Sequence, residues 1–166
     1  MSKISVLIAA AGEGFRAGLP YPKTLFSIEG KPILVRIVEL LAPYNSEPIV
    51  IVQEDGKEQI NKCLLQNNIQ AQLVIQPMQH GMGDAVLCFE NLAKPDQSEH
   101  VLLVWGDIPF IQPQTVAAIV NHHLEKNNDF TFATRVVDKA YTVVLRDKSG
   151  NVTRLMETRE EGITNL

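Results

Sequence analysis

The stretch Ile4-Ser-Val-Leu-Ile-Ala9 runs directly into Ala10-Ala-Gly-Glu-Gly-Phe-Arg-Ala-Gly-Leu-Pro-Tyr-Pro-Lys-Thr24, and this junction decides the fold class. The first part is a continuous apolar run, as expected of a strand that is buried on both faces of a parallel sheet. The second part is rich in glycine and proline and therefore predicts a loop. A glycine-rich loop that leaves a buried strand lets backbone N–H groups approach a phosphate closely.

Strands and helices alternate along the chain from this junction to residue 126. We therefore expect a mostly parallel sheet with helices on both sides, a Rossmann-like three-layer α/β/α fold. Pro32 suits the first position of the first helix. Further apolar runs predict strands over 48–52, 71–75 and 101–105, and helical periodicity predicts helices over 32–41, 57–66, 83–92 and 113–126.

The pattern changes after residue 126. Residues 130–137, 141–146 and 152–157 predict strands with no helix between them, and Asp147-Lys-Ser-Gly-Asn151 predicts a hairpin loop. The hairpin is expected to add to the α/β part rather than to form a separate domain. The sequence stops without a clear closing element, so we expect a C-terminally truncated chain.

Composition and charge narrow the class of protein. Of the 166 residues, 45% are hydrophobic and 20% are charged, which indicates a globular fold. The net charge of −4 argues against a nucleic-acid partner, because such proteins present basic surfaces. The two cysteines form no C-x-x-C pair, which favours a reducing, cytoplasmic setting. Apolar runs stay well short of the roughly 20 residues that span a bilayer, so no membrane partner is expected, and the oligomeric state is left open.

Two common phosphate-binding motifs fit the loop poorly. A P-loop needs G-x-x-x-x-G-K-[ST], but Lys23 follows Pro22 and the first glycine is also missing. Gly12-x-Gly14-x-x-Ala17 matches the dinucleotide fingerprint G-x-G-x-x-G/A. That motif must open directly into a helix, which Pro20 and Pro22 prevent. A NAD-dependent oxidoreductase therefore stays a weaker alternative.

A third pattern fits the loop better. It consists of an apolar strand, A-A-G-x-G-T-R, a short spacer and P-K. This chain has Ala10-Ala-Gly-Glu-Gly-Phe-Arg16 and then Pro22-Lys23, with Phe15 in place of the usual threonine or serine. In this it resembles the sugar-phosphate nucleotidyltransferases. The resemblance implies a nucleotide-binding role for Ala10, Ala11, Gly12 and Gly14 and a catalytic role for Arg16 and Lys23.

A second motif follows the third predicted strand. Gln76-Pro-Met-Gln-His-Gly-Met-Gly-Asp-Ala85 stands where that family has Q-x(4)-G-T-x-x-A. A glutamine amide offers a donor and an acceptor side by side, which suits the edge of uracil or thymine. The resemblance implies that Gln76, Gly81 and Met82 bind the base, and it favours UTP or dTTP. Asp84 is expected to be an acid in the first turn of the next helix, where the helix dipole favours negative charge.

A third motif follows the fourth predicted strand. Val104-Trp-Gly-Asp-Ile-Pro-Phe110 matches the family pattern G-D-x-P-[LF]. An aspartate at the carboxyl end of a parallel strand lies at the edge where open α/β sheets bind ligands. Its carboxylate suits Mg²⁺, which one or two carboxylates and phosphates usually hold. The resemblance therefore implies that Asp107 is a ligand to Mg²⁺, while Trp105 is expected in the sheet core.

The last matching motif is Gly150-Asn-Val-Thr-Arg-Leu-Met-Glu157, which is similar to the family's G-x-V-x-x-I-x-E. The resemblance, strongest to the uridylyltransferases of N-acetylglucosamine 1-phosphate, implies that Glu157 contacts the sugar. Tyr141 and Thr142 match the sugar loop, although the family has glycine after the tyrosine. We therefore expect one nucleotidyltransferase domain over 1–166, in which 1–126 bind the nucleotide and 127–166 begin the sugar-binding part.

The expected reaction joins a nucleoside triphosphate to a sugar 1-phosphate with release of pyrophosphate and with Mg²⁺ as the cofactor. The family's second metal ligand, an asparagine or aspartate followed by glycine, has no secure counterpart before Leu166. A non-catalytic nucleotide-binding or regulatory domain of the same fold therefore stays an alternative.

Overall fold

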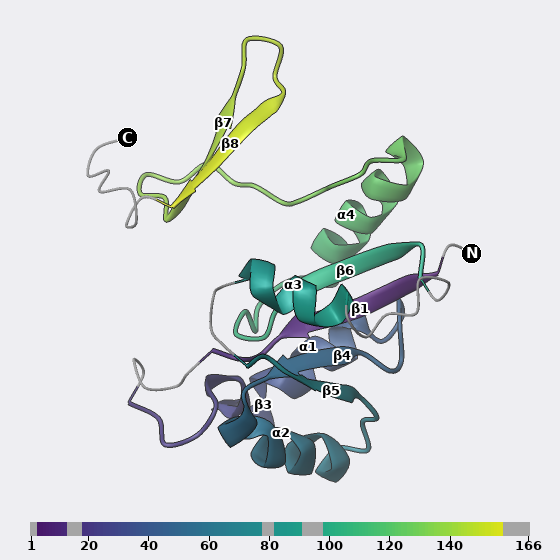
Figure 1. Cartoon of the computed structure of the whole chain (residues 1–166), viewed down its shortest axis with the longest axis vertical. Helices are drawn as coiled ribbons and strands as arrows, with labels where there is room; N and C mark the ends of the chain where they lie inside the picture. Colours follow the sequence, from purple (N-terminus) through teal and green to yellow (C-terminus); the bar gives the residue numbers. More distant parts are fainter. Residues whose placement is uncertain (1–2, 13–17, 78–81, 91–97, 158–166) are drawn as a thin grey trace.

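A parallel four-stranded sheet forms the centre of the computed structural model, which describes residues 3–12, 18–77, 82–90 and 98–157. Its strands lie in the order β5-β4-β1-β6, and each neighbouring pair is parallel (Figure 1). The chain thus starts in the middle of the sheet, moves outward on one side and returns to the other. The strands are β1 (Ile4–Ala9), β4 (Ile49–Val52), β5 (Gln72–Ile75) and β6 (His100–Trp105).

Helices cover both faces of this sheet, which confirms the predicted three-layer α/β/α fold. Side chains of β1 alternate between the faces. Val6 and Ile8 belong to a buried cluster with α1, α2 and α4, whereas Leu7 packs with Ala85 and Phe89 of α3. In Figure 1, α3 lies on one side of the sheet, and α1 and α2 lie on the other. The helices are α1 (Ile33–Leu41), α2 (Glu54–Gln66), α3 (Met82–Glu90) and α4 (Pro113–Lys126).

The central strands β1 and β4 are mostly apolar because neither face of the sheet meets water there. Leu7 and Ile8 are fully buried although they point to opposite faces, and so are the adjacent Val50 and Ile51 of β4. Burying each of these side chains stabilises the fold by about 1.5–3 kcal/mol. The continuous apolar run in the sequence is therefore the direct signature of a two-sided sheet.

Two predicted helix starts differ from the structure. The helix expected from residue 57 begins three residues earlier, at Glu54, because acidic residues in its first turn interact well with the helix dipole. Pro32 is the residue before α1 rather than its first helical residue. It belongs instead to a short ribbon of β2 (Ser27–Ile28) and β3 (Lys31–Pro32), which the sequence did not predict. Glu29 and Gly30 join these strands, both with positive φ, as a tight hairpin turn requires.

The strand predicted over 130–137 is wrong. These residues adopt no regular secondary structure, and no described strand pairs with them. The segment is held at its start by side chains instead. His123 at the end of α4 contacts Thr131 Oγ1 at 3.1 Å and His100 at 3.2 Å, and Asn128 donates to the same hydroxyl at 3.0 Å.

The predicted hairpin is confirmed as β7 (Thr142–Arg146) and β8 (Val152–Glu157), which stand clear of the central sheet in Figure 1. Its loop is organised by Asp147. The carboxylate accepts hydrogen bonds from the backbone N–H of Ser149 and Asn151 and from the Asn151 side chain, at 2.9 to 3.0 Å. These bonds, led by the one from the Asn151 side chain, lower the pKa of Asp147.

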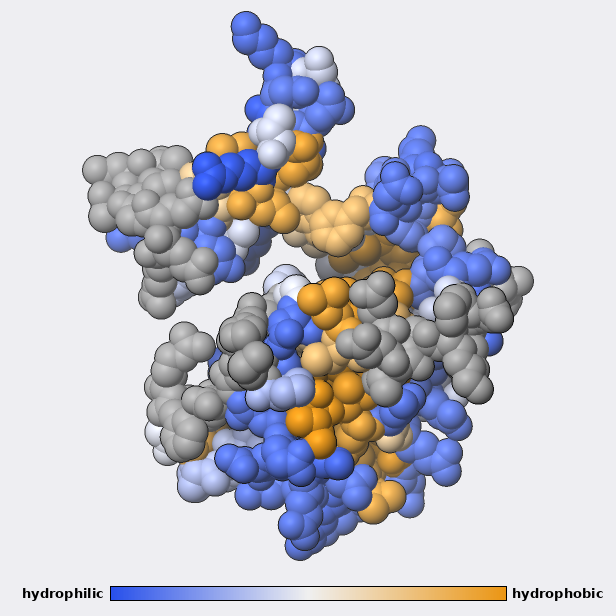
Figure 2. Space-filling view, viewed as in Figure 1, coloured by the Kyte–Doolittle hydropathy of each residue, from blue (hydrophilic) through white to orange (hydrophobic). Residues whose placement is uncertain are grey.

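Trp105 does not lie in the core, contrary to expectation. Its side chain is 55% exposed because β6 has β1 as its only partner among the described strands. Figure 2 shows apolar side chains exposed over α3 and β6, and the exposed apolar residues of these elements include Val86, Leu87, Val101 and Trp105.

Both cysteines, Cys63 and Cys88, are free thiols. None of the described helices is long and apolar enough to cross a bilayer.

Candidate active site

Three of the four predicted motifs begin at the carboxyl edge of the sheet. Backbone hydrogen bonds continue past the strand ends: Ala10 donates to Ile51 at 2.8 Å and Gly106 donates to Ala9 at 2.8 Å. Gln76 likewise donates from its backbone to Val52 at 2.9 Å. Because each motif begins with a residue tied to a neighbouring strand, the sheet fixes where the following side chains start.

Lys23 and Asp107 form an ion pair at this edge. Lys23 Nζ donates to Asp107 Oδ2 at 2.8 Å, and the two side chains are 46% and 38% exposed. Lys23 opens the short 3-10 helix η2 (Lys23–Leu25), in which Leu25 donates its backbone N–H to Pro22. The structure therefore brings together the cation after the glycine-rich loop and the carboxylate after β6, which were both predicted as site residues.

Gly106 and Thr24 lock these two segments together. A Cβ on Gly106 would lie 2.9 Å from the backbone oxygen of Ala9, 3.0 Å from Thr24 Cγ2 and 3.2 Å from Ala10 Cα. Only glycine fits such a close approach. Thr24 is only 3% exposed, and its hydroxyl has no hydrogen-bond partner within the described part of the chain. The sequence motifs contain Gly106 and lie beside Thr24, but they gave no sign that these residues touch.

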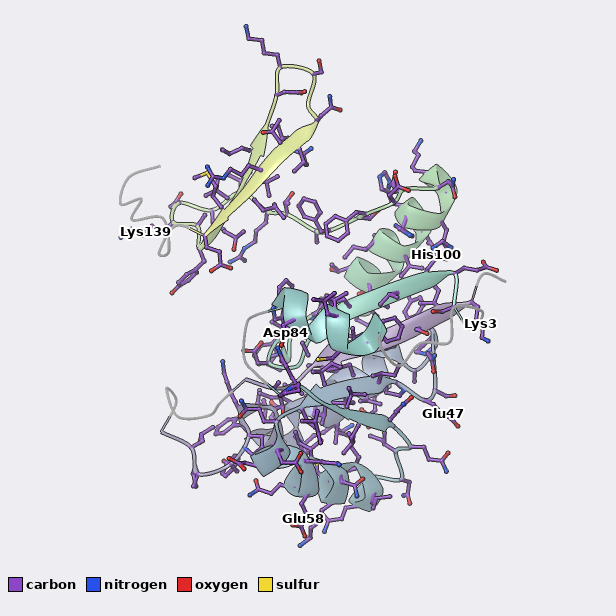
Figure 3. The ribbon with its side chains drawn as sticks, in the orientation of Figure 1. Lys3, Glu47, Glu58, Asp84, His100 and Lys139 are labelled. Atoms are coloured by element: carbon purple, nitrogen blue, oxygen red, sulfur yellow. The ribbon has the colours of Figure 1, made fainter. Side chains whose placement is uncertain are left out.

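Gln76 follows β5 and is 6% exposed. Its side-chain Nε2 donates to Asp84 Oδ2 at 2.8 Å. Asp84 lies in the first turn of α3, as predicted (Figure 3), but its bond to Gln76 was not foreseen. The signal in the sequence is limited to an acidic residue eight positions after the glutamine, with two glycines between them.

The nucleotide-binding residues of the loop are described in part. Ala10 and Ala11 are buried, at 3% and 7% exposure, whereas Gly12 is exposed with open space at the position of a Cβ. Met82 is the first residue of α3. Three further predicted residues, Gly14, Arg16 and Gly81, lie outside the described residues.

The predicted sugar-binding residues lie near one another in the hairpin, away from the ion pair of Lys23 and Asp107. Thr142 and Glu157 face each other across the β7–β8 ladder. Tyr141 precedes the first of these strands and is 69% exposed. Because the hairpin stands clear of the sheet in Figure 1, this cluster lies apart from the edge that carries Lys23 and Asp107.

Asp107 suits a hard cation through one carboxylate. Among the described residues, no three His, Cys, Asp or Glu side chains converge as a ready-made metal site. A single carboxylate fits Mg²⁺, because this ion keeps several waters and takes its remaining ligands from substrate phosphates.

Comparison with known proteins identifies the family. Residues 6–162 match the family model of the MobA-like NTP transferase domain. The chain belongs to this family. It is 30% identical over 162 residues to the bifunctional protein GlmU of Thermoanaerobacter pseudethanolicus and 32% identical over 164 residues to that of Caldicellulosiruptor saccharolyticus. Each alignment covers 96% of this chain but only 34% and 35% of the relative, so the chain spans about a third of these proteins.

Solved nucleotidyltransferase structures share the fold. The 4-diphosphocytidyl-2C-methyl-D-erythritol synthase of Anaerococcus prevotii superposes with a TM-score of 0.59. The superposition covers 91% of this chain and 63% of that one, at 22% sequence identity. At this identity the likeness establishes the Rossmann-like architecture but not the substrate.

Proposed function

We propose that this chain transfers a nucleoside monophosphate from UTP or dTTP to a sugar 1-phosphate and releases pyrophosphate. The observation that carries the proposal is the ion pair of Lys23 and Asp107. These residues are 84 positions apart in the sequence, yet their side chains meet at 2.8 Å where open α/β sheets bind ligands. A cation and a carboxylate held together at such an edge are the charges that phosphoryl transfer needs.

The reaction proceeds by in-line attack of a sugar-phosphate oxygen on the α-phosphorus, with pyrophosphate as the leaving group. That oxygen is already anionic, so no general base is needed. Lys23 neutralises the charge that grows on the α-phosphate, and Arg16 binds the triphosphate and the departing pyrophosphate. Asp107 would hold Mg²⁺, which would supply further positive charge to the phosphate oxygens.

The other predicted residues bind the base of the nucleotide and the sugar of the second substrate. Gln76 reads the base from the end of β5, two strands away from β1 in the sheet. The facing pair Thr142 and Glu157 contacts the sugar, together with Tyr141. Transfer therefore requires the hairpin to approach the carboxyl edge of the sheet when both substrates are bound, since it stands clear of the sheet in Figure 1.

The test measures pyrophosphate release with Mg²⁺, each of UTP, dTTP, CTP and GTP, and a panel of sugar 1-phosphates. We expect release with UTP or dTTP, and we expect Lys23→Ala and Asp107→Ala each to slow it at least about a hundredfold. The fold should survive both changes, because an exposed ion pair contributes only about 0–1 kcal/mol. Asp129→Ala, an exposed aspartate after α4, is the matched control and should keep the wild-type rate.

Unchanged turnover in Lys23→Ala or Asp107→Ala would overturn the assignment. If no pair of substrates releases pyrophosphate but nucleotides raise the melting temperature, the chain is instead a non-catalytic nucleotide-binding domain.

A further inference from the structure

We propose that Asp84 is a positioning residue that fixes the orientation of the Gln76 amide and so makes the site select keto bases over amino bases. This inference rests on the proposed function, because it concerns the base of the nucleotide. The contact behind it is the hydrogen bond from Gln76 Nε2 to Asp84 Oδ2, at 2.8 Å.

An ionised carboxylate accepts hydrogen bonds and cannot donate one. The atom of the Gln76 amide that faces Asp84 must therefore be the nitrogen, and the amide oxygen must point elsewhere. Rotating the amide by half a turn would place two oxygens against each other in a half-buried setting, where a lost hydrogen bond is costly. Asp84 lies in the first turn of α3, where the helix dipole favours an acidic side chain. Its negative charge is also felt by Cys88, whose pKa is raised by burial and by Asp84.

Both partners are held by the fold, so neither can easily adjust to the other. The Gln76 backbone extends the β4–β5 ladder by donating to Val52, and its side chain is 6% exposed. Asp84 is followed directly by Ala85, which is 2% exposed and packs with Phe89 of α3 against the sheet. The distance between the strand end and the helix is thus set by core packing rather than by the hydrogen bond itself.

The orientation of the amide matters because the hydrogen-bond donor and acceptor on the edge of uracil or thymine are exchanged in cytosine. Uracil and thymine present a ring N–H donor beside a carbonyl acceptor, whereas cytosine presents a ring nitrogen acceptor beside an amino donor. An amide that can rotate offers its donor and acceptor in either order and satisfies both kinds of base. An amide that is fixed in one orientation satisfies one kind of base, which under the proposed function is uracil or thymine. It faces the other kind with donor against donor and acceptor against acceptor. Such a mismatch is a strong source of discrimination, since buried polar groups are left unpaired.

The variant Asp84→Asn tests this idea without changing the shape of the side chain. An asparagine amide can accept from Gln76 Nε2 or donate to Gln76 Oε1, so both orientations of Gln76 become allowed. We expect the ratio of kcat/KM for UTP to kcat/KM for CTP to fall about tenfold, which corresponds to about 1.4 kcal/mol. The ratio of the Kd for CTP to the Kd for UTP, measured by calorimetry with Mg²⁺, should fall by a similar factor. Asp55→Asn is the matched control, because it removes the same charge from the first turn of α2.

The outcomes separate this inference from the function on which it rests. If the wild-type chain binds and turns over UTP in preference to CTP and Asp84→Asn keeps that preference, Asp84 does not set base selection. If Asp55→Asn relaxes the preference as much as Asp84→Asn does, the effect is one of helix charge and the positioning role is wrong. If the wild-type chain binds neither nucleotide, the proposed function is wrong, and the role of Asp84 that rests on it is wrong as well.

Discussion

Replacing Gly106 by alanine tests the close packing that joins the two charged segments of the site. The added methyl group would lie 2.9 Å from the backbone oxygen of Ala9 and 3.2 Å from Ala10 Cα, and neither atom can rotate away. The third contact, Thr24 Cγ2 at 3.0 Å, belongs to a side chain that is itself buried. The backbone must therefore shift, at a cost of about 2 kcal/mol in the free energy of unfolding. For a chain of this size, that cost lowers the melting temperature by about 4–8 °C.

Thermal and urea unfolding followed by circular dichroism measure this effect, with Gly83→Ala as the matched control. Gly83 lies in the first turns of α3 and has open space around the position of its Cβ, so the same substitution should be neutral or stabilise by up to about 1 kcal/mol. Adding Thr24→Ser to Gly106→Ala removes one of the three contacts and should restore part of the lost stability. A Gly106→Ala protein that melts at or above the wild-type temperature would refute the packing argument.

Three further predictions address single side chains. Thr24→Val should raise the free energy of unfolding by about 1 kcal/mol in urea titrations, because it replaces a buried hydroxyl that has no partner among the described residues; a loss of stability would contradict this. Because hydrogen bonds lower the pKa of Asp147, its contribution to the order of the hairpin loop should be present above its ordinary value of 3.8 and lost as the pH falls through the lowered pKa of the folded loop. Amide exchange in the loop should show this, and Asp147→Asn should remove the pH dependence. Asp84→Asn should lower the raised pKa of Cys88 and speed its alkylation at a given pH, while Cys63, whose pKa is raised by burial alone, should react at an unchanged rate.

Local signals predicted the elements of the α/β part well. The bounds of α4 follow from Pro113, which suits the start of a helix, and from Asn127, which ends it in the left-handed conformation. The strand Ile4–Ala9 follows from an apolar run that neither helix periodicity nor alternation explains. In each case, the physical cause lies within a few residues of the element.

The predictions that failed depend on distant neighbours. An apolar run becomes a strand only when another strand pairs with it, and no described strand pairs with residues 130–137. Trp105 looked like a core residue because its strand is apolar, but burial also depends on what lies beyond the strand, and β6 has one described partner.

The motifs indicated which residues follow the strands at this edge, but not which side chains touch one another there. Family motifs pointed to Lys23, Asp107 and Gln76, and the sheet places all three at one edge. The roles of these residues remain predictions. The partner of Gln76 could not be foreseen, because it depends on where α3 packs on the sheet rather than on any local pattern.

The strand order β5-β4-β1-β6 also fixes how far apart Gln76 and Asp107 lie along this edge. Gln76 follows β5 and Asp107 follows β6, at opposite ends of the sheet. Adjacent strands lie about 4.8 Å apart, so three steps separate these residues by about 14 Å along the edge. A molecule that touches both must be elongated and must cross above β4 and β1. Changes in the connecting loops can alter which side chains lie at this edge. The separation between the ends of β5 and β6 changes only if a strand is added, lost or exchanged.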